Sequence, residues 1–163
     1  MSLTTTAITP DAPSTDARYA RAAAVAHTLL RVFAGALFMQ HGAQKLFGAF
    51  GGPMGNGTGV PLMSLFGLAG VIELVGGFLI VIGFFTRAAA FLASGEMATA
   101  YFMMHFPHGF WPIQNRGEIV VLFCFVFLYL AASGAGPWSV DGALFGRRGG
   151  IAGTGATRPT FVP

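Results

Sequence analysis

The sequence predicts an all-α integral membrane protein, a four-helix bundle with antiparallel up-down topology. Hydrophobic residues make up 54% of the 163 residues and charged residues only 9%, whereas roughly a quarter of a soluble domain is charged. The chain also has 24 glycines and 17 phenylalanines, which suit closely packed helices in lipid. Four apolar stretches each approach the length of about 20 residues that a spanning helix needs.

Other classes of protein fit the composition poorly. The net charge is +3, but the basic residues are scattered along the chain and do not form the basic stripe of a nucleic-acid-binding protein. The single cysteine, Cys124, cannot make an intramolecular disulfide or a metal cluster alone. The chain has no HExxH, CxxC or GxGxxG motif. We therefore expect no nucleic-acid partner and no metal site, and no pattern indicates haem or flavin.

The predicted domain extends over residues 18–145, between two tails. Residues 1–17 are rich in Thr, Ala, Pro and Asp, which predicts a disordered N-terminal tail. A signal peptide is not expected, because Asp11 and Asp16 precede the first arginine and no apolar run follows a basic start. Residues 146–163 are expected to form a flexible C-terminal tail.

The four spans are expected at about 22–47, 62–85, 88–106 and 117–134. A glycine-rich loop joins the first two. The second and third are joined by little more than Thr86 and Arg87, so they must form an antiparallel hairpin. Phe106, Phe110 and Trp111 lie between the third and fourth spans, as in an interfacial aromatic belt. Pro137 follows the last span and ends it.

The arginines predict the orientation of the spans. An even number of spans puts both termini on the side of the turn at Arg87. That side collects most of the arginines, which are Arg18, Arg21, Arg87, Arg147 and Arg148. The other side has Arg116 and, at the end of the first span, Lys45. The positive-inside rule therefore predicts that both termini are cytoplasmic.

Charged residues within the spans are the candidates for function. A charge at the bilayer centre costs roughly 2.5–3.5 kcal/mol on insertion scales and needs a partner or a wet cavity. Near the middle of their spans lie Arg31, Glu73 and Glu96, the candidate intramembrane polar site. Toward the outer surface lies a candidate polar cluster of His41, Gln44, Lys45, Arg116 and Glu118. We expect the three cations to balance the three glutamates, with Arg31 facing Glu73 and Glu96.

Helical spacing predicts that these groups face the interior. Small residues share a helix face with each mid-span glutamate, so another helix can approach and shield the carboxylate. The three faces are Gly70, Glu73 and Gly77; Ala93, Glu96 and Ala100; and Arg31, Gly35, Phe38, Gly42 and Lys45. The glutamates are then either structural clamps between helices or groups for catalysis, quinone contact or proton transfer.

Five motifs in this order resemble the DoxX family of small four-helix membrane proteins. They are HGAQKLFG at 41–48, GVIELVGG at 70–77, TRAAA at 86–90, NRGE at 115–118 and GPWSVD at 136–141. Together they cover about residues 25–145. The order of the motifs and their positions on the helices make the resemblance specific, although each motif alone is weak.

The resemblance implies a multi-pass protein of the bacterial inner membrane. Many DoxX proteins are described as candidate oxidoreductases, and relatives include the membrane subunit of a thiosulfate:quinone oxidoreductase. Others are linked with superoxide dismutase and sulfurtransferase in oxidative-stress defence. The expected function is thus a redox-associated, quinone-linked membrane subunit or anchor. Its expected partners are the lipid bilayer, a soluble redox enzyme and a second copy of the chain. A small proton-coupled transporter and a non-catalytic scaffold for a stress-response complex remain as alternatives.

Overall fold

The computed structural model describes residues 14–145, and every regular element in that range is a helix. The elements that form the long helical stretches are α1 (Thr15–Phe47), α2 (Leu65–Val71), η2 (Ile72–Gly76), α3 (Gly77–Ile82), α4 (Thr86–Ala100), η3 (Tyr101–His105) and α6 (Glu118–Ser133). Short turns complete the list, namely η1 (Ala49–Gly51), η4 (Phe106–His108), α5 (Pro112–Asn115) and α7 (Val140–Phe145). Both expected tails lie mainly outside the described range, as do Arg147 and Arg148.

The first helix begins seven residues earlier than expected. Ser14 is its N-cap, and the Ser14 hydroxyl accepts a hydrogen bond from the backbone N–H of Ala17. Asp16 lies in the first turn, where a negative charge stabilises the helix dipole. The prediction of disorder up to residue 17 is therefore wrong at its C-terminal end, because these capping residues start a helix that the apolar pattern alone does not include.

By length and apolar composition, two helical stretches of the described chain are able to cross a membrane. They are Thr15–Phe47 and Leu65–Ile82, the latter combining α2, η2 and α3. Helix α6 is also apolar, but it has 16 residues and is about 24 Å long. Helix α4 continues without a break into η3.

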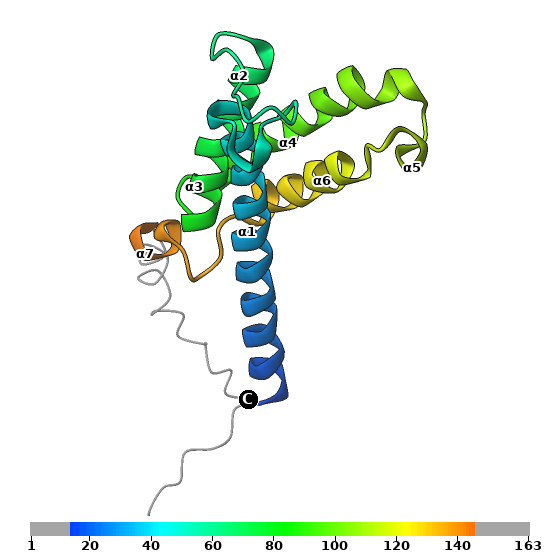
Figure 1. The fold of residues 1–163 in the computed structure, drawn as a ribbon. Coiled ribbons are helices and arrows are strands. Elements are labelled where there is room, and N and C mark those ends of the chain that lie inside the picture. The colour runs from blue at the N-terminus through cyan, green and yellow to red at the C-terminus, as the bar shows by residue number, and fades with distance from the viewer. Residues whose placement is uncertain (1–13, 146–163) are drawn as a thin grey trace, which may run out of the picture.

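The long helices pack as two pairs. The C-terminal half of α1 lies along α2, η2 and α3, while α4 lies along α6. Figure 1 shows the α4–α6 pair directed across α1 rather than along it. The N-terminal part of α1 extends beyond both pairs (Figure 1). Tyr19, near the start of this helix, is 72% exposed.

Small residues allow α1 to approach its neighbour closely. A Cβ added at Gly42 would lie 2.4 Å from the Leu74 nitrogen and 2.7 Å from the Gly70 carbonyl oxygen. One added at Gly35 would lie 2.9 Å from the carbonyl oxygen of Gly77. The predicted small-residue faces of the first two spans are thus confirmed, since a side chain at these positions would push backbone against backbone.

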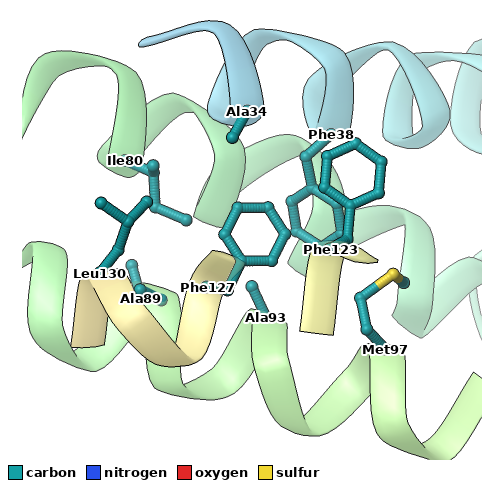
Figure 2. Close-up of a cluster of buried hydrophobic side chains, with 10 residues drawn as sticks. Ala34, Phe38, Ile80, Ala89, Ala93, Met97, Phe123, Phe127 and Leu130 are labelled. Atoms are coloured by element: carbon teal, nitrogen blue, oxygen red, sulfur yellow. The ribbon is translucent and has the colours of Figure 1, made fainter. Parts of the chain in front are cut away.

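The aromatic core joins the two pairs. Phe38 from α1 packs against Phe123 and Phe127 from α6, with ring centroids 6.1 and 4.7 Å apart. Figure 2 shows these rings between α1 and α4, with Ala93 and Met97 of α4 filling the remaining space. The core therefore fixes where α6 crosses α1.

The segment after α6 ties down the turn between α3 and α4. The carboxylate of Asp141 accepts hydrogen bonds from the backbone N–H groups of Phe85 and Thr86, at 2.9 and 3.0 Å. The N–H of Asp141 donates to the carbonyl of Gly83 at 2.8 Å. Asp141 thus caps the N-terminus of α4 from a distant part of the chain.

Candidate functional site

A cavity of about 390 Å³ lies between the two helix pairs, with walls from α1, α2–η2, α4–η3 and α6. We call it the Lys45 pocket. Its polar side chains are those of His41, Lys45, Glu73, Glu96 and His105, and its other walls are alanine, isoleucine, valine, methionine and phenylalanine. The pocket therefore combines a small charged group with an apolar, aromatic surround.

Lys45 and Glu73 form an ion pair at one wall of the pocket. The Lys45 Nζ lies 2.5 Å from Glu73 Oε1, and the Glu73 side chain is only 3% exposed. It is the one ion pair among residues 14–145. The second carboxylate oxygen of Glu73, Oε2, is buried and finds no hydrogen-bond partner in this part of the chain. Such a pair needs further hydrogen bonds to offset its loss of hydration.

Glu96 brings a second carboxylate to the same pocket from α4. Its Oε2 is also buried and has no partner among the described residues. Glu73 and Glu96 thus share one cavity with a single ammonium group, that of Lys45. The pocket has one carboxylate more than its ammonium can neutralise.

Two histidines complete the polar set. His41 lies one turn before Lys45 on α1, and its ring meets Phe123 edge-on with centroids 6.4 Å apart. The Nδ1 of His105 lies 3.0 Å from the Asn115 carbonyl oxygen. Because a carbonyl only accepts, this Nδ1 carries the hydrogen, and Nε2 of a neutral ring is left as an acceptor.

The position of His105 in the pocket is absent from the sequence-based site. The expected third span, 88–106, includes His105 at its end, but the predicted site does not. In the structure η3 continues α4 through His105, and the His105 side chain lines the cavity. His105 follows Glu96, Ala100 and Met104 on the side of the helix that lines the pocket, and this helical spacing is the signal that could have found it.

Both walls of the pocket contain a π-helical turn. Glu73 lies in η2 and His105 ends η3. Such wide turns are rare and occur frequently at functional sites, because they redirect side chains away from regular helical spacing. Their presence on two different helices at one cavity supports a role for the pocket beyond packing.

Arg31 does not face the glutamates, so the expected grouping with Glu73 and Glu96 is wrong. Its guanidinium donates to the carbonyls of Ile80, Val81 and Trp138, at 2.6, 2.5 and 2.7 Å. These acceptors lie at the C-terminal end of α3 and after α6. Arg31 lies four turns before Lys45 on α1, so it contacts the C-terminal end of α3, whereas Lys45 contacts Glu73 in η2, just before α3 begins.

The expected outer-side cluster is also divided. Of its members, His41 and Lys45 line the pocket. Gln44 turns toward the glycine-rich loop, where its Nε2 lies 3.4 Å from the Gly52 carbonyl. Arg116 and Glu118 are exposed and lie at a separate surface hollow with Ile113 and Leu122. Only one of the three expected ion pairs forms within the described residues, and it joins Lys45 to Glu73.

No group of three His, Cys, Asp or Glu side chains within residues 14–145 is arranged to hold a metal ion. The polar groups of the pocket instead suit hydrogen bonding to an organic ligand or transfer of a proton. The ammonium donates, the carboxylates accept, and a neutral imidazole does both. These groups are able to hydrogen-bond a ligand or to exchange protons with it.

Comparison with known proteins tests the resemblance seen in the motifs. A family model described as DoxX matches residues 26–106, the stretch that contains Lys45, Glu73 and Glu96. An uncharacterized protein of Haemophilus influenzae is 42% identical over 119 residues, 71% of this chain and 88% of that protein. An uncharacterized membrane protein of Mycobacterium tuberculosis is 28% identical over 127 residues, 69% of this chain and 77% of that protein. No solved structure matches. The family predicted from the motifs is confirmed, and the chain belongs to the DoxX family of membrane proteins.

Proposed function

We propose that this chain is a redox-associated subunit of the bacterial inner membrane and that it binds a quinone in the Lys45 pocket. The observation that carries the proposal is a lysine ammonium placed inside a cavity with aromatic and methionine walls. A quinone has a flat apolar ring and carbonyl oxygens that need hydrogen-bond donors. A volume of about 390 Å³ is within the usual range of small-molecule sites.

The donors come from one face of α1. An ammonium has three N–H groups, and Glu73 uses one of those on Lys45. His41, one turn away, offers a ring N–H from the same side of the pocket. Phe38 and Phe123 supply the wall against which a ring packs. A head group bound here would have its carbonyls at α1 and its ring toward α6.

Binding of decylubiquinone to the purified protein in detergent tests the proposal. Wild type should bind, and His41→Ala should weaken binding by about tenfold through the loss of one donor to the quinone. Glu73→Gln should weaken binding by about the same factor, because it removes the ion pair that positions the Lys45 ammonium. Glu118→Gln, an exposed substitution outside the pocket, is the matched control and should bind like wild type. Failure of wild type to bind more tightly than the pocket variants would refute the proposal.

We also propose that all four apolar stretches span the membrane in antiparallel order, with both termini cytoplasmic. Exposed apolar side chains along α4 and α6, such as Phe91, Leu122 and Phe125, support insertion of this pair. If the bilayer normal points between the directions of the two pairs, the helices of both pairs are tilted from it, as spanning helices commonly are. Arg18, Arg21 and Arg87 support a cytoplasmic position for the end of the molecule that they share.

The family resemblance supports two protein partners, a soluble redox enzyme and a second copy of this chain. A non-catalytic scaffold is an alternative to the quinone-binding subunit. It would also bind a soluble enzyme, but it would need no quinone. Recovery of a soluble enzyme with the wild-type protein in mild detergent, without any quinone, would favour the scaffold.

A proton-coupled transporter is the second candidate, and the Glu96 carboxylate is the observation that favours it. Buried carboxylates in membrane proteins often mark proton relays. Proton flux in proteoliposomes that depends on Glu96 would support transport. Equal flux in wild type and Glu96→Gln would exclude it.

A further inference from the structure

Two carboxylate oxygens in the Lys45 pocket have no hydrogen-bond donor among residues 14–145. They are Oε2 of Glu73 and Oε2 of Glu96, both buried. Glu73 is 2% exposed and Glu96 comes from the facing helix. Buried polar atoms in proteins are nearly always hydrogen-bonded, and those that are not call for an explanation such as a ligand.

The donors already present do not meet this need. Lys45 bonds Oε1 of Glu73, and His105 directs its Nδ1 to the Asn115 carbonyl. The side chains that line the pocket from α6 are Ile119, Val120 and Phe123, which have no polar atoms. The remaining donors among the lining residues are His41 and the two other N–H groups of Lys45, all on α1, and none of them is bonded to either Oε2 atom. A ligand that brings hydrogen-bond donors to this side of the pocket would satisfy both glutamates.

This requirement distinguishes the two oxidation states of a quinone. A quinone carbonyl accepts hydrogen bonds and cannot satisfy a carboxylate oxygen. A hydroquinone has two hydroxyl groups, each of which donates one hydrogen bond and also accepts. A hydroxyl bonded to an ionised carboxylate makes a charge-assisted bond, roughly twice as strong as one between neutral groups.

We propose that the Lys45 pocket selects the reduced ligand, a hydroquinone, and that Glu73 and Glu96 accept hydrogen bonds from its hydroxyl groups. The inference rests on the proposed quinone site and adds which oxidation state the site prefers. Glu96 is then the specificity-determining residue, because Glu73 already holds Lys45. The hydroxyl oxygen still accepts from the Lys45 ammonium, so the reduced form satisfies both kinds of partner.

The affinities of decylubiquinol and decylubiquinone for the full-length protein in detergent, measured under argon, test this selection. Wild type should bind the quinol about tenfold or more tightly than the quinone, as expected for a hydrogen bond to a charged acceptor. The dimethyl ether of the quinol has the same ring but no hydroxyl donor and should bind no better than the quinone. The ether comparison uses the wild-type protein and so does not depend on any variant folding.

Glu96→Gln should reduce the quinol preference to about equal affinity, because an uncharged amide no longer makes a charge-assisted bond. Glu118→Gln, outside the pocket, should keep the preference. Equal wild-type affinity for quinol, quinone and ether would overturn the selection while leaving the quinone site intact. Binding of none of the three would overturn the quinone site, and the selection with it.

Discussion

Arg31 is a buried cation whose partners are backbone carbonyls. The residue is 2% exposed, and its guanidinium bonds three carbonyl oxygens, those of Ile80, Val81 and Trp138. Two of them belong to the last turn of α3, where unpaired carbonyls and the helix dipole favour a positive charge. The arginine thus joins α1, the end of α3 and the segment after α6.

Replacing Arg31 with methionine should destabilise the protein. The variant keeps much of the side-chain volume but removes the Arg31 donor from three carbonyls, of which only that of Ile80 keeps another hydrogen bond, from the N–H of Gly83. We expect a loss of about 3–5 kcal/mol by analogy with breaking a buried charged network. Arg31→Lys should recover only part of this, because an ammonium lacks the planar fork that reaches three carbonyls at once. Thermal unfolding in detergent measures the effect. Arg116→Met, a substitution of an exposed arginine, is the control. An Arg31→Met protein that unfolds at the same temperature as this control would contradict a stabilising role of Arg31.

The partner of Glu73 in the Lys45–Glu73 ion pair could be predicted only in part. Sequence position shows that Glu73 needs a cation and that Lys45 and Arg31 lie on the neighbouring helix, but depth alone favoured Arg31. The acceptors that hold Arg31 are carbonyl groups, which every residue has, so no sequence pattern marks them. For the same reason the capping of α4 by Asp141 could not be predicted, although GPWSVD was identified as a motif.

At the scale of the helices, glycine decides how closely α1 approaches α2 and η2. The spacing of Gly70, Glu73 and Gly77 predicted this face, and all three residues are buried although the π-helical turn η2 interrupts the regular periodicity between them. The turns η2 and η3 were not predictable in this way, because a π-helical turn arises from packing and has no marker among the residues. The beginning of α1 was missed because Ser14 and Asp16 act as capping groups rather than as part of the apolar pattern.

Gly42→Ala should destabilise the α1–α2 contact. The added Cβ would lie 2.4 Å from the Leu74 nitrogen and 2.8 Å from its Cα, and backbone atoms cannot move aside without separating the helices. Overpacking of this kind costs about 1–3 kcal/mol. Because Lys45 follows one turn later, the variant should also weaken ligand binding at the pocket.

Gly95→Ala is the matched control for that substitution. Gly95 is a helical glycine of α4, and an added Cβ would meet nothing within 4 Å. Alanine is favoured over glycine in a helix interior by up to about 1 kcal/mol, so this variant should be as stable as wild type or more so. Thermal unfolding of both variants in one detergent gives the comparison. Equal thermal stability of the two variants would show that the close approach of α1 at Gly42 does not contribute to the stability of the protein.

At the scale of the whole molecule, the Lys45 pocket exists because the two helix pairs cross. Each pair supplies one carboxylate, Glu73 from η2 and Glu96 from α4, and the aromatic core around Phe38 fixes their relation (Figures 1 and 2). The sequence predicted four apolar segments and an inward position for both glutamates. It could not predict the crossing, which depends on how Phe123 and Phe127 fit against α1 rather than on any period along one helix.

The number of spans can be measured by cysteine labelling in a Cys124→Ser background. The exposed positions Met54, Gln114, Ala17 and Leu144 would each be changed to cysteine and treated with a membrane-impermeant maleimide in spheroplasts. Four antiparallel spans with cytoplasmic termini put Met54→Cys and Gln114→Cys outside, so both should label. Ala17→Cys and Leu144→Cys should label only after the membrane is opened.

Gln114 distinguishes four spans from two. If only α1 and the α2–η2–α3 helix cross the bilayer, as the two stretches that meet the length criterion would allow, the α5 turn that contains Gln114 stays on the side of the termini. Gln114→Cys would then label only after the membrane is opened, as Ala17→Cys does. Met54→Cys would be the one variant of the four that labels in intact spheroplasts. Because α4 and α6 supply Glu96, His105 and Phe123 to the Lys45 pocket at the outer end of α1, the result also decides between a pocket whose walls all lie in the membrane and one whose α4 and α6 walls lie outside the bilayer. Only the first case gives a membrane-dissolved quinone direct access from the bilayer.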